Sequence, residues 1–421
     1  MRRGDTYLIA SSVFLIMGML VALAYWHQPI VIALQSAGAY TQSVAVFFVE
    51  SITPEQLRLA YTGGQQPTAG VPSAPDKIRV LIVPGHEPDS GGTQFADYTE
   101  RDIAVELADK LAALLEGNPH FDVMVARTKD SWNPVLAQYF TDHAADIEAF
   151  REQQTSLMNQ YLLDGRILQE GAEQVQHNNA PTTAALHLYG VNKWASENNI
   201  SITLHLHIND YPGRNGGTIG TYGGFAIYVP NNQYSNARAS RAIGAALAAR
   251  LNEYHATSSF LNEPNGVIED QQLIAIGSNN SADAASVLIE YGYIYEAQFR
   301  NAATRNIAEE DYSYETYLGL QDFFNDPAPS RFGTDVLPYE WSMDTSAGSI
   351  QPDTYALQAG LRYLGFYPPA GRTFDDCPVS GYFGPCTRRA LDAFQGSRQL
   401  PVDGTLDQPT RQALTAAIAG V

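Results

Sequence analysis

Apolar positions follow two different periods along the middle of the chain. Short aliphatic runs, such as residues 80–83 and SITLHLHI at 201–208, have the length of buried strands bounded by turn signals. Between them, residues 100–116 carry leucine and isoleucine at helical spacing, with Thr99 as N-cap and Gly117-Asn118-Pro119 as a stop. Strands that alternate with helices predict an α/β fold, a mixed sheet flanked by helices.

The amino-terminal pattern is different, because residues 7–26 form an almost unbroken apolar stretch of bilayer-spanning length. Arg2 and Arg3 precede it, which favours a cytoplasmic amino terminus and export of the later domains. We therefore expect a transmembrane anchor at 1–28, then a membrane-proximal segment and Gly/Pro-rich linker over 29–76. A cleaved signal peptide and secretion are the alternative, since the chain has two A-x-A sites in this region.

The remaining pattern divides the chain further. We expect the α/β domain to span residues 77–325. Its polar-rich helical stretch, the insertion at 132–197, is longer than a minimal sheet connection needs. A Pro-rich break over 326–348 predicts a second linker. A last segment follows at 349–421.

Charge and cysteine content limit which classes of partner and which cellular compartment we expect. The formal net charge is −20 and no basic cluster interleaved with aromatics occurs, so we expect no nucleic acid partner. Cys377 and Cys386 are the chain's two cysteines, too few for a zinc-thiolate site. Their closeness favours one local disulfide in an oxidising compartment, with two free thiols as the alternative.

The candidate catalytic and metal-binding residues lie mainly at the ends of predicted strands. His86 follows a Pro-Gly turn directly after the first strand, and Glu100 opens the next helix, so both side chains can face one point. In SITLHLHI, alternation puts His205 and His207 on one face. Histidine nitrogens and a carboxylate suit Zn²⁺, with a fourth position left for water. Glu290 stands in an otherwise apolar strand, and its burial costs several kcal/mol unless it is paired or needed.

These motifs together carry a resemblance. IVPGH with Glu100, RTKD at 127–130, H-x-N at 207–209 and VLIEYG around Glu290 resemble the zinc-dependent N-acetylmuramoyl-L-alanine amidases, in order and spacing, from residue 77 to about 305. The resemblance implies hydrolysis of the amide between N-acetylmuramic acid and L-alanine in peptidoglycan. It implies that Zn²⁺ is bound by His86, Glu100 and His207 and that Glu290 is catalytic. It selects His207 over His205, whose role stays open.

The insertion at 132–197 also has a counterpart in that resemblance. In relatives, an inserted helix in this part of the fold can cover the zinc and be displaced by an activator. The resemblance therefore implies a hypothesis of autoinhibition, with a protein activator as a possible partner beside peptidoglycan and the membrane.

The last segment is similar to a second family, the small helical peptidoglycan-binding domain, and this resemblance implies a small all-α domain. GYFGPCTRRALDAFQ at 381–395 and LPVDGTLDQPTRQAL at 400–414 carry its pattern, with Ser380 where aspartate is usual. Helical spacing predicts six core residues, Leu357, Leu361, Leu364, Ala390, Leu391 and Phe394.

Two alternatives to the amidase remain open from the sequence. A zinc peptidase that cuts within the stem peptide would use the same four residues, and only the bond cleaved separates the two enzymes. A non-catalytic wall-binding protein on an amidase scaffold is the other, although such scaffolds usually lose a ligand or the acid.

Overall fold

The computed structural model describes residues 50–62, 77–169, 182–277, 281, 283–326, 339, 341 and 348–420. The predicted anchor at 1–28 lies outside these residues, as does most of the linker at 326–348. Within the described ranges, none of the helices combines the length and apolar character needed to cross a membrane.

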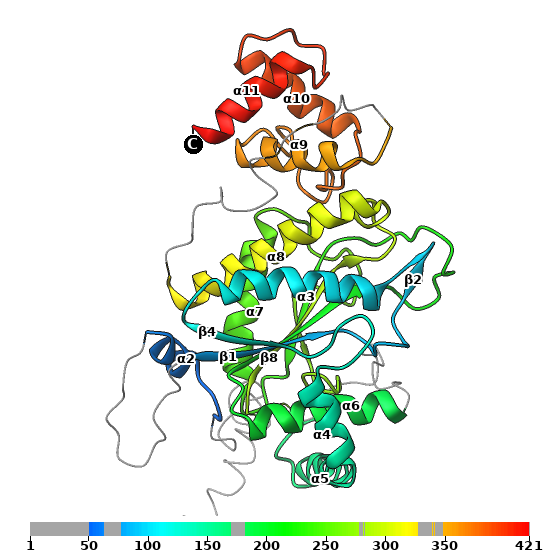
Figure 1. Cartoon of the computed structure of the whole chain (residues 1–421), viewed down its shortest axis with the longest axis vertical. Helices are drawn as coiled ribbons and strands as arrows, with labels where there is room; N and C mark the ends of the chain where they lie inside the picture. Colours follow the sequence, from blue (N-terminus) through cyan, green and yellow to red (C-terminus); the bar gives the residue numbers. More distant parts are fainter. Residues whose placement is uncertain are drawn as a thin grey trace, which may run out of the picture.

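A mixed sheet forms the centre of the molecule (Figure 1), which confirms the predicted α/β class. Its strand order is β4-β1-β5-β8-β6-β7. Four neighbouring strands, β4, β1, β5 and β8, run parallel, whereas β6 is antiparallel to β8 and parallel to β7. The strands are β1 (Ile78–Pro84), β4 (Phe121–Val125), β5 (Ile202–Asn209), β6 (Ala226–Pro230), β7 (Val267–Asp270) and β8 (Ala285–Tyr293). A hairpin of β2 (Gln94–Phe95) and β3 (Tyr98–Thr99) precedes α3.

Helices bury both faces of this sheet. Alternate residues of β1 belong to separate cores: Val80 packs in the cluster with α3, α7 and α8, and Leu81 packs with Leu136 of α4 and Val191 of α6. Burial on both faces explains why residues 80–83 of β1 form an unbroken apolar run. The helices are α2 (Pro54–Tyr61), α3 (Glu100–Glu116), α4 (Pro134–Asp142), α5 (Ala144–Leu163), α6 (Thr182–Glu197), α7 (Ala237–Asn252) and α8 (Ala302–Phe324), with a 3-10 turn η1 (Ala297–Phe299).

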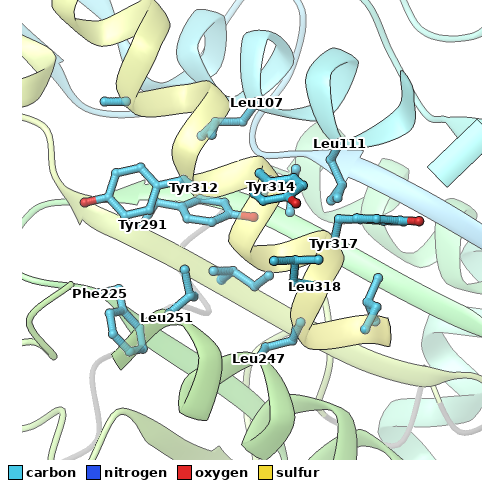
Figure 2. Close-up of a cluster of buried hydrophobic side chains, with 14 of the residues drawn as sticks. Leu107, Leu111, Phe225, Leu247, Leu251, Tyr291, Tyr312, Tyr314, Tyr317 and Leu318 are labelled. Carbon is cyan, nitrogen blue, oxygen red and sulfur yellow. The ribbon is translucent and has the colours of Figure 1, made fainter. Parts of the chain in front are cut away.

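The larger core lies between α3, α7, α8 and the sheet (Figure 2). Leu107 and Leu111 of α3 face tyrosines of α8, and Tyr291 of β8 is fully buried there. Its hydroxyl lies 2.9 Å from Thr316 Oγ1, so the buried oxygen is hydrogen-bonded. Thr99 occupies the predicted N-cap position of α3 but makes no side-chain cap hydrogen bond.

The carboxyl-terminal segment is all-α, as predicted, and lies against α8 (Figure 1). Its helices are α9 (Pro352–Tyr363), α10 (Pro385–Ser397) and α11 (Gln408–Ala419). Cys377 and Cys386 form the predicted disulfide. Five of the six predicted core residues are fully buried, and Leu364 is half-buried just after α9.

Candidate metal centre

Three predicted site residues meet at the carboxyl edge of the parallel strands. His86 Nε2 lies 2.8 Å from Glu100 Oε2, and His207 Nδ1 lies 2.9 Å from Glu100 Oε1. One ligand atom from each of the three residues lies within 4.8 Å of the others. Two ligands about 2.1 Å from a tetrahedral ion are roughly 3.4 Å apart, a spacing that lies between the 2.8 Å contact and the 4.8 Å limit of this cluster.

The backbone that carries His86 is held by Arg127, whose side chain is fully buried. His86 has a φ of 69°, in the left-handed region that non-glycine residues rarely adopt. Arg127 donates to the carbonyls of Pro84 (3.2 Å) and Gly85 on one side and of Arg101 (3.0 Å) on the other. Burial lowers the pKa of Arg127 to about 10, so it stays charged at neutral pH. The turn after β1 and the first turn of α3 are thereby fixed together.

Close packing also explains the glycine of the Pro-Gly turn. A Cβ on Gly85 would lie 2.5 Å from Cε1 of His207, closer than real Cβ contacts. Only glycine lets the turn pass against the imidazole ring, so this residue sets the spacing of the two histidines.

The three residues are electrostatically coupled. Burial opposes ionisation of Glu100, but His86 and His207 outweigh it and hold the pKa of this carboxyl well below its usual range. Thr93 N, at 2.9 Å, donates to the same carboxylate. Burial lowers the pKa of His207 and favours the neutral imidazole that a metal requires. Among the described residues, His86 Nε2 is buried and has no partner with hydrogen-bond geometry.

Glu290 lines the same cavity, which has a volume of about 480 Å³. It pairs with His207 across β5 and β8, and it is 7% exposed. Its Oε2 has no hydrogen-bond partner among the described residues. Burial, followed by the charges of Glu100 and Glu263, raises the pKa of Glu290 well above its ordinary value. A carboxyl in this environment is suited to accept a proton.

His205 lies outside the three-residue cluster, although it also lines the cavity. It is 1% exposed. Burial, and then the neighbouring His207, lowers its pKa to about 3, so the ring is neutral at physiological pH.

Sequence reasoning missed a second buried carboxylate, Glu263. It accepts hydrogen bonds from Asn209 Nδ2 (2.7 Å), Tyr228 OH (2.8 Å) and Tyr293 OH (2.9 Å). Glu263 lies in a loop before β7, where no local pattern distinguishes it from a surface acid. Its partners come from three strands, so only the assembled sheet reveals the cluster.

The insertion forms one wall of the cavity that is lined by His86, Glu100, His207 and Glu290, which we call the metal cavity after its candidate ligands. Trp132, Ala184 and Leu188 line it together with the three clustered residues. Glu87, directly after His86, accepts a hydrogen bond from Trp132 Nε1 (3.1 Å), and His187 Nδ1 of α6 lies 2.8 Å from the same carboxylate oxygen. The insertion is therefore tied to the loop that carries His86, a contact that sequence reasoning did not anticipate.

Comparison with solved structures returns amidases with low sequence identity. The CwlD amidase from Clostridioides difficile, in complex with the GerS lipoprotein, is 16% identical, with a TM-score of 0.38 over 59% of this chain and 99% of that one. Ami1 from Mycobacterium smegmatis is 13% identical, with a TM-score of 0.36 over 59% and 97%. The CwlV catalytic domain from Bacillus (Paenibacillus) polymyxa var. colistinus is 15% identical, with a TM-score of 0.35 over 59% and 98%. No curated protein matches the chain.

Family models match two parts of the chain. Residues 351–414 match the peptidoglycan-binding domain. Residues 80–322, more than half of the chain, match the model described as N-acetylmuramoyl-L-alanine amidase. The chain therefore belongs to the N-acetylmuramoyl-L-alanine amidase family, acts on the amide between N-acetylmuramic acid and L-alanine in peptidoglycan, and carries a peptidoglycan-binding domain at its carboxyl end.

Proposed function

We propose that this amidase is zinc-dependent, with His86, Glu100 and His207 as metal ligands and Glu290 as the catalytic acid and base. The observation that carries the proposal is the convergence of the three ligand atoms within 4.8 Å in the cavity that Glu290 lines. Two imidazoles and one carboxylate fit Zn²⁺, and three protein ligands leave a position for water or substrate.

In amide hydrolysis, the metal ligands and Glu290 have separate tasks. Bound Zn²⁺ supplies Lewis acidity to the scissile carbonyl and lowers the pKa of water. Glu290 takes a proton from the attacking water, since burial raises the pKa of its carboxyl toward the working range. It then delivers that proton to the L-alanine nitrogen as the carbon–nitrogen bond breaks. The products are the free lactyl acid on the sugar and a stem peptide with a free amine.

We also propose a division of the chain around this site. Residues 77–325 form the catalytic domain with the insertion 132–197, and 349–421 form the wall-binding domain after a linker at 326–348. The enzyme acts outside the cytoplasm, where peptidoglycan lies, and the Cys377–Cys386 disulfide agrees with that compartment. The anchor at 1–28 would hold it at the membrane, with secretion after signal cleavage as the alternative.

The insertion supports a further part of this proposal, autoinhibition relieved by a protein activator. Its residues wall the metal cavity and bond to the loop after His86. Trimming the insertion should then raise the hydrolysis rate, and an unchanged rate in a folded, zinc-loaded deletion variant would remove this part.

Mass spectrometry of the products tests the central proposal. Purified peptidoglycan is incubated with the zinc-loaded protein and with the protein after chelation. Stem peptides that begin with a free L-alanine, released only with zinc, are the expected result. Shortened stems still joined to muramic acid would mean a peptidase instead. Pelleting with the wall without any products would mean a binding protein.

A variant pair tests the role of Glu290. Glu290→Gln should keep zinc and fold but lose about 10²- to 10⁴-fold in turnover, because the amide cannot transfer the proton. Glu116→Gln is the matched control, because Glu116 is exposed and lies at the opposite end of α3 from Glu100. Turnover near wild type in Glu290→Gln would exclude Glu290 from proton transfer.

A further inference from the structure

A second cavity, of about 760 Å³, lies between the catalytic domain and the carboxyl-terminal helices. It shares no lining residue with the metal cavity. The catalytic domain supplies one wall, from the glycine-rich segment 219–224 and the residues just after β8. The peptidoglycan-binding domain supplies the other wall, from Phe374, Asp375, Ser380 and Tyr382. We call this space the interdomain cleft.

Buried contacts fix the two walls relative to each other. Arg362 of α9 donates to both carboxylate oxygens of Asp311 in α8, at 3.1 and 2.9 Å, and Tyr355 OH donates to the same carboxylate at 3.0 Å. Gly381, beside the cleft, passes so close to α8 that a Cβ there would lie 2.6 Å from Thr304 Cγ2. Buried charge pairing and such close approach are typical of a permanent interface, so the cleft is preformed.

The lining of the cleft suits an uncharged, amphipathic ligand. Tyr222, Tyr295, Tyr382 and Phe374 supply aromatic surface, and short hydroxyl side chains lie among them. Tyrosine combines an apolar ring face with a polar end, which matches the apolar faces and hydroxyl edges of a sugar ring. Exposed apolar side chains come from both walls, with Ile219 at 58% and Tyr382 at 45% exposure.

The charges in the cleft do not favour an ionic ligand. Glu296 is engaged internally, because its Oε1 accepts from Gly224 N (3.0 Å) and Tyr293 N (2.7 Å). Burial raises the pKa of Glu296, which favours its neutral form. Arg300 and Asp375 then leave one charge of each sign in the lining.

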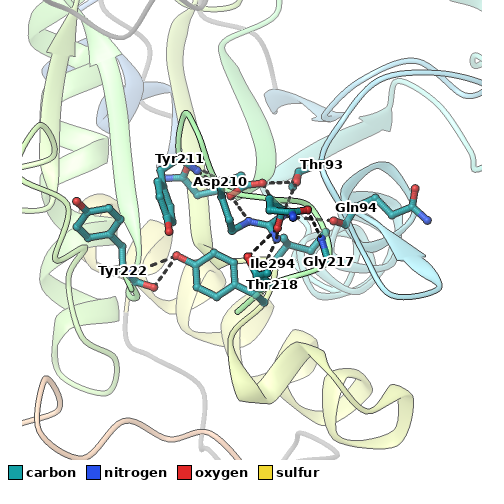
Figure 3. A network of polar contacts seen from close by, with 12 residues as sticks. Thr93, Gln94, Asp210, Tyr211, Gly217, Thr218, Tyr222 and Ile294 are labelled. Atoms are coloured by element: carbon teal, nitrogen blue, oxygen red, sulfur yellow. Dashed lines mark hydrogen bonds and ion pairs between the residues drawn. The ribbon is translucent and has the colours of Figure 1, made fainter. Parts of the chain in front are cut away.

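Polar contacts gather around Asp210 (Figure 3), a residue that lines the metal cavity. Thr93, whose backbone amide binds Glu100, donates its hydroxyl to Asp210 at 2.6 Å, and Asp210 lines the metal cavity. Arg214 pairs with Asp210 at 2.6 Å and lies over the ring of Tyr295, 5.1 Å from its centre. Tyr295 lines the cleft, so Arg214 contacts one lining residue of each cavity.

We propose that the interdomain cleft is a subsite for the glycan strand, which takes the uncharged sugar backbone of the polymer whose stem peptide is cleaved at the metal cavity. This inference rests on the proposed function, because it assigns the substrate contacts of the same enzyme. The cleft would then select polymeric strands over single muramyl peptides, through contacts remote from the scissile bond.

Binding and kinetics of full-length variants test the subsite. Tyr382→Ala removes an exposed ring from one wall, and Thr221→Trp fills the cleft from an exposed position on the other. Val402→Ala is the matched control, since Val402 is 59% exposed in the same domain but does not line the cleft. The binding probe is glycan strands freed of their peptides, with the lactyl carboxyls capped as methylamides so that the strand is uncharged. The kinetic substrates are peptide-bearing strands and a monomeric muramyl peptide.

Both cleft variants should bind peptide-free strands at least about fivefold more weakly, because one removes an aromatic anchor and the other fills the space that the strand would occupy. Their KM for peptide-bearing strands should rise by a similar factor, while kcat and cleavage of the monomer stay unchanged. Wild-type affinity and KM in both variants would overturn the proposal, as would binding of free stem peptides in place of strands. Wild-type protein that cleaves neither substrate would refute the proposed function instead, while strand binding still reports on the cleft.

Discussion

Replacing Asp311 with asparagine tests the docking of the two domains. Asp311 and Arg362 have side chains that are 1% and 2% exposed, so both charges lack solvent. Removing one partner of such a pair costs about 3–5 kcal/mol, because the remaining charge stays buried without compensation. Glu315 Oε1 lies 3.9 Å from Arg362 and compensates part of the charge. We therefore expect a loss of roughly 3 kcal/mol for Asp311→Asn, at the lower end of that range.

Guanidinium chloride unfolding, followed by tyrosine and tryptophan fluorescence, measures this loss. The double variant Asp311→Asn/Arg362→Met is the control, because it removes both charges and keeps most of the volume. A buried pair replaced in this way is often neutral, so the double variant should be more stable than Asp311→Asn alone. A loss below about 1 kcal/mol in Asp311→Asn, the size of an exposed pair, would refute the reasoning.

The same carboxylate gives a pH dependence. Burial raises the pKa of Asp311, but Arg362 outweighs it and holds the pKa well below its ordinary value. The unfolded chain has a pKa of about 3.9 for aspartate. Because the pKa of Asp311 is lower in the folded protein, its stabilisation is fully present above the unfolded pKa. The stabilisation is lost as the pH falls from the unfolded pKa through the folded pKa. The stability of the wild type should therefore fall more steeply in acid than that of Asp311→Asn, and equal slopes would contradict this assignment.

Three further predictions concern the metal site and the disulfide. Gly85→Ala should weaken zinc binding at least tenfold, measured by calorimetry, because its Cβ meets the His207 ring; Gly216→Ala, with open space around it, should not. The Cys377→Ser/Cys386→Ser variant should lose roughly 2.5 kcal/mol by the loop-entropy relation, and equal midpoints in denaturant would contradict it. Chelation should abolish stem-peptide release and added Zn²⁺ should restore it, whereas activity that survives complete metal removal would exclude a zinc mechanism.

Local sequence patterns were sufficient to predict most of the central fold. β1 and α3 lie where apolar period and turn residues predicted them, because each buries a whole face against neighbours. α8 was not predicted, since it is buried on nearly all sides although many of its buried residues are polar, such as Glu309 and Glu315. Its pattern has no single apolar face, because it packs on the sheet side and under the carboxyl-terminal domain at once.

The candidate ligands were foreseeable because parallel strands bring their carboxyl ends to one edge, so positions in sequence translate into proximity. Family motifs were still needed to choose His207 over His205, since alternation places both on one face. The contacts that hold the site in place could not be foreseen. Arg127 donates to backbone carbonyls of two elements, and Glu263 accepts from side chains of several strands.

By itself, therefore, the sequence determined the main strands of the sheet, helix α3 and the candidate site residues at the strand ends, because hydrophobic period and motif spacing are local. Only the tertiary structure decided how the insertion walls the metal cavity and how the peptidoglycan-binding domain docks on α8. Contacts such as Glu87 with His187 and Asp311 with Arg362 join residues separated by 100 and 51 positions. Their energy comes from excluding water around paired charges, and that environment exists only once the whole chain has folded.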